Sequence, residues 1–272
     1  MEVGYTRRWL QHFVVTDNLI VTANDFGTFG VTAPQDNRLP DGGGYSVSGL
    51  YDVNLAFGGQ FNNLLTFNDL LAENPRQYQH YDGITLDFSA RPRNGLLFQG
   101  GINTGKTVTD NCEVRTLLPE VAPLNPYCHN EPGFITRWTG LMSYTIPRID
   151  VSVSGTIRSD QGAPLQANWN APLSAIVPSL GRPLSANQQF ATVNLITPGD
   201  VWGDRVNEVD FRVGKIIRIG RARTNIGVDL FNVFNSDAVL TYNQVFVPNG
   251  PWLAPLSVLT PRFVKISAQI SF

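Results

Sequence analysis

The end of the chain alternates apolar and polar residues with a period of two. Val264, Ile266, Ala268, Ile270 and Phe272 fall in one phase, and the residues between them, which include Lys265, Ser267 and Gln269, fall in the other. A period of two places the two sets on opposite faces of a β-strand. Residues 208–213 and 225–230 repeat the alternation, with a short turn at residues 219–222 between them. The sequence therefore predicts three long strands at its end.

The same pattern predicts five earlier strands, which makes eight in all. They are expected at residues 3–15, 80–90, 96–108, 134–146 and 151–159. Strands of about 9–13 residues are long, because strands in globular proteins usually have about five or six residues. The first strand is the least regular, since Arg7 and Gln11 interrupt its apolar phase.

The connections between these strands alternate in length. Short turns join strands two and three, four and five, and six and seven, whereas long segments at residues 16–79, 109–133, 160–204 and 236–260 join the others. Outer-membrane barrels show this alternation, with short periplasmic turns and long external loops. The predicted fold is all-β: an antiparallel transmembrane β-barrel portion of about eight strands. Within the long segments, residues 42–51 and 188–196 are expected to form hairpins and residues 61–71 a short helix.

Charged residues within the strands keep to the phase opposite the main apolar set. They are Asp87, Arg137, Arg158, Glu208, Asp210, Arg212, Asp229 and Lys265. A charge on the lipid face near the membrane midplane costs roughly 2–4 kcal/mol, so a barrel has to turn these residues toward its lumen. A half-exposed sheet of a soluble protein would show the same separation, and strand length is what favours the membrane interpretation.

Composition narrows the function classes. The chain has 25 Gly and 18 Pro, and only 15% of its residues are charged, which suits strands and turns better than helices. With a net charge of −2, the chain has no excess of positive charge to attract nucleic acid, which argues against a nucleic-acid-binding function. No apolar run approaches the roughly 20 residues of a membrane-spanning helix, so the membrane prediction rests on strands alone.

A family resemblance rests on the last third of the chain. Residues 229–235 (DLFNVFN) follow residues 212–220 (RVGKIIRIG), and the chain closes on Phe272. This arrangement resembles the end of a TonB-dependent receptor barrel, most closely that of the large receptors with a carboxypeptidase-regulatory-like domain at the amino end. The resemblance implies active uptake across the outer membrane of a Gram-negative-type bacterium, with the substrate left open. It also implies contact with outer-membrane lipid, insertion by the barrel-assembly machinery through the C-terminal strand, and energy from an inner-membrane complex.

The resemblance covers about the last third of a family barrel of about 22 strands. Residues 1–272 are therefore expected to be a C-terminal fragment, without signal peptide, plug or earlier strands, that does not transport alone and leaves its first and last strands unpaired. One alternative is a self-contained eight-stranded barrel with an adhesive or structural role, since eight strands can close around a lumen filled by side chains. Small residues in the predicted lumen phase, such as Gly101, Ser152 and Ser154, favour a wider barrel. A soluble β-rich binding protein is a third possibility.

The two cysteines, Cys112 and Cys128, lie in one long segment and are predicted to pair. A disulfide would close a loop of about 17 residues, worth about 3 kcal/mol in the chain-entropy model, and would indicate an oxidising compartment. Two unpaired thiols are the alternative.

No enzyme, cofactor or metal site is predicted. Residues 100–107 (GGINTGKT) match the phosphate-binding pattern G-x-x-x-x-G-K-[ST], but β-branched and turn residues follow where that motif needs a helix. The match is thus interpreted as glycines that relieve crowding on a strand. His12, His80 and His129 are widely spaced, and no Ser or Cys is flanked by an evident base. Asp and Trp residues of the long segments could contact a sugar, peptide or siderophore, or simply pack together: Asp36, Asp41, Trp169, Trp202 and Trp252.

Overall fold

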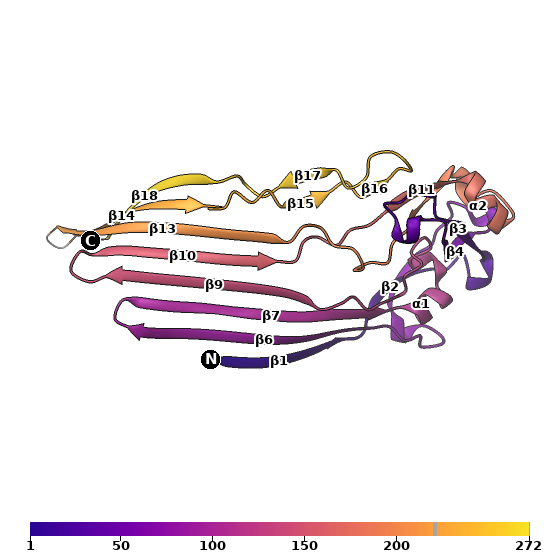
Figure 1. Ribbon diagram of the computed structural model, residues 1–272. Helices are drawn as coiled ribbons and strands as arrows, with labels where there is room; N and C mark the ends of the chain where they lie inside the picture. The colour runs from indigo at the N-terminus through magenta and orange to yellow at the C-terminus, as the bar shows by residue number, and fades with distance from the viewer. Residues whose placement is uncertain (220–221, 272) are drawn as a thin grey trace.

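The computed structural model describes residues 1–219 and 222–271 of an all-β protein (Figure 1). Its main sheet runs in the order β1-β6-β7-β9-β10-β13-β14-β18, and every pair of neighbours is antiparallel. The eight strands are β1 (Glu2–Leu10), β6 (Tyr78–Arg93), β7 (Leu96–Asp110), β9 (Ile135–Ile146), β10 (Val151–Asp160), β13 (Val206–Ile219), β14 (Ala222–Phe231) and β18 (Phe263–Ser271). A two-residue strand, β8 (His129–Asn130), pairs with the end of β7. The prediction of eight long strands joined alternately by short turns and long segments is confirmed.

The first predicted strand is wrong beyond Leu10. His12 has φ 56°, in the left-handed region, and a residue there cannot continue a strand. Its Nδ1 lies 2.6 Å from Oδ2 of Asp69. The chain therefore leaves the main sheet, and β2 (Val14–Asn18) pairs instead with β5 (Asn63–Phe67).

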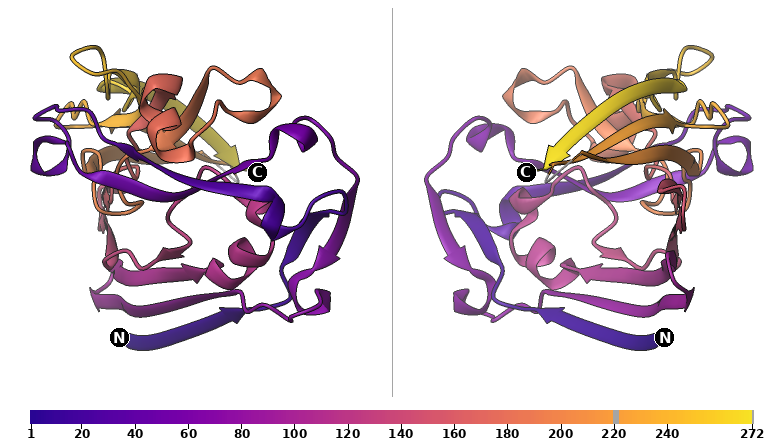
Figure 2. Two further views of the ribbon diagram at one scale, coloured as in Figure 1. Left: turned by 90° about the vertical axis from the view of Figure 1, so that its right-hand side faces the viewer. Right: turned by 90° about the vertical axis from the view of Figure 1, so that its left-hand side faces the viewer.

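The main sheet is open. β1 forms one edge and β18 the other, and within the described ranges each pairs with a single neighbour, β6 and β14 respectively. Views along the strands show the sheet curving around a central space without its two edges meeting (Figure 2). The predicted lack of pairing between the first and last strands is confirmed.

The long segments fold together at one end of the sheet into a unit that we term the cap: residues 11–77, 111–134, 161–205 and 232–262. The cap contains the hairpin β3 (Phe26–Thr32) and β4 (Ser46–Val53), the sheet β12-β11-β16 (Phe190–Asn194, Asn168–Pro172, Val245–Phe246), and the pair β15 (Val239–Tyr242) and β17 (Pro255–Val258). It also holds α1 (Cys112–Leu117) and α2 (Leu173–Leu180), with single 3-10 turns at Ala23–Asp25, Pro40–Gly42, Leu55–Phe57, Asn68–Leu70, Pro119–Val121 and Ser185–Asn187. The hairpins expected within residues 42–51 and within residues 188–196 are wrong, because each stretch holds a single strand, β4 or β12, whose partner, β3 or β11, lies earlier in the chain. The helix expected at 61–71 is wrong, because β5 and a 3-10 turn occupy that stretch. Among the described residues, no helix is long and apolar enough to span a membrane.

The largest hydrophobic core lies in the cap. Its buried residues come from three segments far apart in the sequence: Phe29, Val31, Ala33, Leu39, Val47, Leu50, Leu165, Ala167, Ala171, Ile176, Leu184, Ala191, Val193, Leu195, Ile196 and Phe246. None of the eight long strands contributes to this cluster. The cap thus has a hydrophobic core of its own, to which the long strands do not contribute.

Candidate functional site

One face of the main sheet is apolar and exposed. Strand register aligns Tyr144, Val153, Val213, Val228 and Ile266 in one row across β9, β10, β13, β14 and β18. Ile266 is 77% exposed, Val228 47% and Val213 41%. The other large exposed apolar side chains in this phase are Val3, Tyr5, Trp9, Tyr78, Ile84, Phe88, Ile102, Trp138, Met142, Ile157, Phe211, Ile217, Ile226, Val264 and Ile270. Soluble monomers rarely expose contiguous apolar patches larger than a few hundred Å², so an apolar surface that reaches across eight strands marks an interaction surface for a membrane or another protein.

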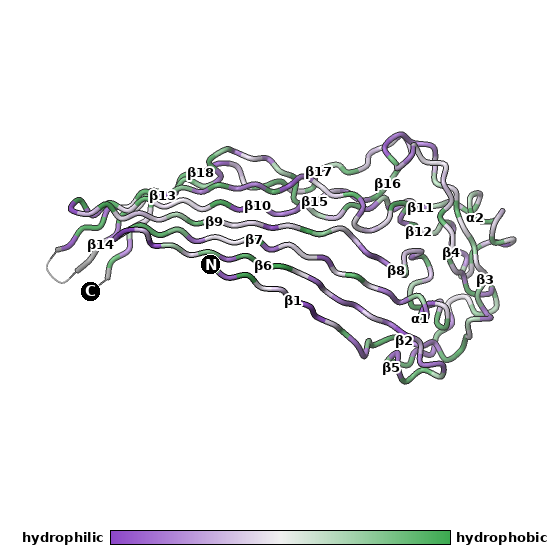
Figure 3. The backbone as a smooth tube through the Cα atoms, turned by 60° about the horizontal axis from the view of Figure 1, so that its bottom comes forward, coloured by the Kyte–Doolittle hydropathy of each residue, from purple (hydrophilic) through white to green (hydrophobic). Residues whose placement is uncertain are grey.

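The opposite face is polar and concave. Register places Asp87, Gly101, Thr139, Arg158 and Glu208 in one row across β6, β7, β9, β10 and β13. A hollow of about 620 Å³ lies over this row and its neighbours, lined from the same five strands. A hollow shared by five strands requires the sheet to curve toward it. Figure 3 shows hydrophobic and hydrophilic residues alternating along these strands.

All eight charged residues singled out in the sequence lie in the phase of the concave face, and ion pairs neutralise most of them. Arg158 Nη2 lies 2.8 Å from Glu208 Oε2, and Arg212 Nη1 lies 2.7 Å from Asp229 Oδ1. Arg137 and Arg158 both pair with Asp160, a partner that the sequence analysis missed. Lys265 stands opposite Asp229 in the ladder. Asp210 instead accepts a hydrogen bond of 2.9 Å from the backbone N–H of Asn232, and Asp87 lines the hollow.

The last strand keeps its predicted phase. Val264, Ile266, Ala268 and Ile270 pair with Leu230, Val228, Ile226 and Thr224 of β14, all in the phase of the apolar face. Phe272 lies outside the described residues, so its predicted place in this set is not described.

Charged and aromatic residues border the apolar face. Toward the cap, Arg7 pairs with Asp82 at 3.4 Å and Lys106 pairs with Glu131. Toward the short turns, the guanidinium of Arg93 lies 4.5 Å from the ring centroid of Tyr144. Ten residue steps separate Thr136 from Ile146 within β9. At about 3.4 Å per step and a strand tilt of about 40°, they cover about 26 Å, close to the band of about 25 Å in outer-membrane barrels.

The motif at residues 229–235 spans the end of β14, and two of its side chains hydrogen-bond to the segment that leads into β18. Asn232 and Asn235 have φ of 49° and 54°, left-handed values that Asn tolerates better than most residues. Asn232 is 2% exposed; its amide donates to the carbonyls of Ser236 (2.8 Å) and Thr260 (2.9 Å), and its Oδ1 accepts from the Ser236 N–H. Asn235 Oδ1 accepts from the N–H of Arg262. Both asparagines therefore fix the geometry of the last long connection, a role that the sequence analysis did not assign.

The phosphate-loop match lies within a strand. Residues 100–107 fall inside β7, and Lys106 pairs with Glu131 rather than facing an open loop. Gly105 stands opposite Gly83, and a Cβ at either glycine would come within 2.3 Å of the Tyr81 hydroxyl. The interpretation of these residues as strand positions where glycine relieves crowding is confirmed.

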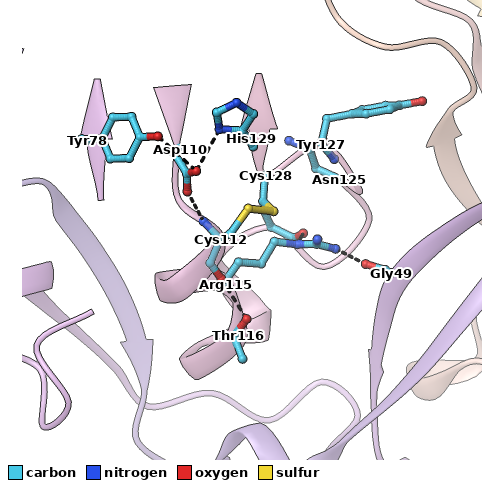
Figure 4. Close-up of a disulfide and its surroundings, with 11 residues drawn as sticks. Gly49, Tyr78, Asp110, Cys112, Arg115, Thr116, Asn125, Tyr127, Cys128 and His129 are labelled. Atoms are coloured by element: carbon cyan, nitrogen blue, oxygen red, sulfur yellow. Dashed lines mark hydrogen bonds and ion pairs between the residues drawn. A yellow bond between two sulfur atoms is a disulfide. The ribbon is translucent and has the colours of Figure 1, made fainter. Parts of the chain in front are cut away.

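The predicted disulfide between Cys112 and Cys128 is present, with a Cα–Cα distance of 4.8 Å (Figure 4). Cys112 begins α1, and Cys128 directly precedes β8. Asp110 contacts the chain near both cysteines. Its Oδ1 accepts a hydrogen bond of 3.0 Å from the Cys112 N–H, and its Oδ2 lies 2.8 Å from Nδ1 of His129, the residue after Cys128. The bond thus ties the two strands of the β7–β8 pair together where the chain enters and leaves the cap.

The aromatic and acidic residues of the cap mostly serve its own packing. Asp36 is buried against Arg38, whose Nε and Nη2 donate to it at 2.8 and 2.6 Å, and these hydrogen bonds hold the pKa of Asp36 well below its usual range. Trp252 donates to the Gln166 carbonyl at 3.0 Å, and Trp202 to the Gly199 carbonyl at 2.8 Å. Trp169 packs on the cap core. These contacts favour loop packing over a ligand role, and Asp41, in the 3-10 turn Pro40–Gly42, stays exposed.

The cap also contains a hollow of about 230 Å³ between three of its segments, lined by Asn18, Phe26, Tyr51, Glu120, Leu124 and Gln188 among others. Burial raises the pKa of Glu120, whose Oε1 accepts a hydrogen bond of 3.1 Å from the Asn18 N–H.

The three histidines do not form a cluster. His12, His80 and His129 each lie beside an aspartate and remain apart from one another. Within residues 1–219 and 222–271, no group of three or more His, Cys, Asp or Glu side chains is placed to hold a metal ion.

Comparison with known proteins assigns no relative. No family model matches the chain, and no curated protein matches it.

Proposed function

We propose that this chain is the C-terminal barrel portion of a TonB-dependent outer-membrane receptor, a transporter that takes up a substrate not identified here. The observation that carries the proposal is the sheet itself. An eight-stranded antiparallel meander has one exposed apolar face, one concave face of paired charges, and all its long connections at one end. Hydrocarbon against the apolar face, water inside the concave face and the cell exterior around the cap account for all three features.

The family within outer-membrane proteins is inferred from residues 229–235 and their setting. The two asparagines of this stretch hold the exit of β14 and the approach to β18, which gives the resemblance a physical basis at the last hairpin. The open edges support a portion of a wider barrel, because unpaired backbone groups are costly in hydrocarbon and further strands are needed to cover them. A self-contained eight-stranded barrel would need a ladder between β1 and β18, and the described residues form none.

The proposed environment also accounts for the disulfide, which persists in an oxidising compartment and lies on the cap side. In the proposed receptor, the lipid face anchors the barrel, and the barrel-assembly machinery engages the C-terminal strand. In the full-length receptor, the energising inner-membrane complex drives uptake.

The native product provides the test. An antibody against the cap would be used to isolate the protein from fractionated membranes of cells that encode it, followed by intact-mass measurement and peptide sequencing. We expect an outer-membrane protein well above 30.0 kDa, with a plug domain and further strands before β1. A native product of 30.0 kDa in the soluble fraction would contradict the proposal, and a 30.0 kDa outer-membrane product would favour the closed small barrel.

A further inference from the structure

Charge is distributed unequally between the two ends of the sheet. The four segments of the cap carry 13 acidic and 6 basic residues. The opposite end, which we term the turn end (residues 91–95, 147–150, 215–219 and 222–223), carries 6 basic residues and 1 acidic residue. The short connections from β6 to β7 and from β9 to β10 lie at this end (Figure 1). A chain with a net charge of −2 thus concentrates positive charge at one end.

Three cations of the turn end, Arg91, Arg93 and Arg148, are exposed. Arg91, Arg93 and Arg148 have no carboxylate within ion-pair distance in the part of the chain that the structure describes, whereas Arg218 pairs with Asp150 at 2.7 Å. The border of the apolar face toward the cap differs, because Arg7 and Lys106 there are both paired with carboxylates. An unpaired guanidinium is free to bind an external anion, and its planar donors suit phosphate oxygens.

Two cations of the turn end, Arg93 and Lys215, lie at the border of the apolar face. The guanidinium of Arg93 stacks on Tyr144, and Tyr144 shares its row with Val153 and Val213. Lys215 lies in the same phase as Val213, two residues along β13, and its ammonium donates to the carbonyl of Ile149. Where an apolar surface meets the headgroup region, long basic side chains keep their stems on the apolar surface and their charges near lipid phosphates.

We propose that the turn end is a binding surface for anionic phospholipid headgroups, with Arg91, Arg93 and Arg148 as its principal contacts. The inference rests on the proposed function, which places this end at the periplasmic leaflet. Continuity of Arg93 and Lys215 with the apolar face favours a lipid over an acidic protein, because one lipid molecule contacts both the cations and the apolar surface. The chemistry recognised is a phosphodiester with net negative charge next to acyl chains.

Lipid binding can be measured on the full chain in detergent by native mass spectrometry, with phosphatidylglycerol and phosphatidylcholine of identical acyl chains. A basic residue near an anionic surface strengthens binding by about fivefold. We expect the unchanged chain to bind phosphatidylglycerol more tightly than phosphatidylcholine. The triple variant Arg91→Gln, Arg93→Gln, Arg148→Gln is expected to bind phosphatidylglycerol at least about tenfold more weakly than the unchanged chain does, with its affinity for phosphatidylcholine unchanged. The matched control Arg7→Gln, Lys106→Gln, at the opposite border, is expected to keep the preference.

The remaining outcomes are distinguishable. Equal retention of both lipids by the unchanged chain, or an equal loss in the control variant, would overturn the inference and leave the proposed function standing. Retention of neither lipid would contradict the proposed function itself. Displacement of phosphatidylglycerol by inorganic phosphate at constant ionic strength would indicate a phosphate site instead of a lipid site. If the triple variant does not fold, raising the salt from 0.05 to 0.5 M on the unchanged chain still tests the inference, because the preference has to fall as screening increases.

Discussion

An arginine placed on the apolar face should be far more damaging than one placed a single residue away. Met142 lies near the middle of β9, next to the midpoint of the stretch from Thr136 to Ile146, and is 41% exposed on the apolar face. Ser143 follows it and lies in the phase of the concave face. Both positions are flanked by β7 and β10, so neither change touches an open edge.

The expected cost of this substitution differs between a bilayer and water. In a bilayer, Met142→Arg is expected to cost about 2–4 kcal/mol, the value for arginine near the midplane of a lipid-facing strand. In water, a substitution at such an exposed site usually stays within about 0.5 kcal/mol. A loss of 2–4 kcal/mol lowers the folding equilibrium constant by about 30-fold to about 900-fold.

The assay is urea unfolding, followed by tryptophan fluorescence, of the full-length membrane protein that contains these residues, in phospholipid bicelles. Ser143→Arg is the control, and it is expected to remain within about 1 kcal/mol of the unchanged chain because its side chain reaches water in the concave face. Equal free energies of unfolding for the two variants, or a larger loss for Ser143→Arg, would refute the assignment of the two faces.

Three further predictions concern the cap and its junction with the sheet. Replacing Cys112 and Cys128 by Ser should cost up to about 3 kcal/mol in the chain-entropy model, seen as a lower urea midpoint of the cap; an unchanged midpoint would show that the bond constrains nothing. Asn232→Ala should destabilise the pairing of β14 with β18 by about 1–3 kcal/mol, because it leaves the partly buried carbonyls of Ser236 and Thr260 and the N–H of Ser236 without their partner, whereas Asn235→Ala, at an exposed position, should cost less. Hydrogen exchange in β14 and β18 would rank the two variants, and the reverse ranking would contradict this role. The pKa of Asp36 is lowered in the folded cap, so the stabilisation that it provides is present above about pH 4, the pKa of a free aspartate, and is lost as the pH falls below that value through the folded pKa; Asp36→Asn should reduce this acid sensitivity of thermal unfolding, and an unaltered pH profile would contradict it.

The long strands could be predicted because each carries its own signal. A period of two identifies a strand, and the turn residues around Gly95 and between Ile146 and Val151 limit it. The concave face was predictable for the same reason, since Arg158 and Glu208 share a phase whatever their partners. Their pairing follows once the strands are in register.

The cap could not be predicted in the same way. Its core joins Phe29, Ile176 and Phe246, which no local period connects. Arg38 illustrates the difficulty: it pairs with the nearby Asp36 but also donates to the carbonyls of Val247 and Gly250, about two hundred residues away. The left-handed backbone at His12, which ends β1 early, could not be predicted either, because histidine is compatible with a strand. Asn232 is the exception, since an asparagine after a strand and before a loop is a recognisable turn signal.

The most direct test of a lipid-facing sheet is an accessibility profile along β9. Single nitroxide labels would be placed in turn at residues 136–145 of the full-length membrane protein that contains them, in bicelles and with the native disulfide intact. The collision rates of each label with oxygen and with a water-soluble nickel complex would then be measured. We predict alternation with a period of two: Trp138, Met142 and Tyr144 favour oxygen, and Arg137, Leu141 and Ser143 favour nickel. High nickel accessibility in both phases, or alternation in the opposite sense, would contradict the proposal that the apolar face of this sheet contacts the hydrocarbon of a membrane.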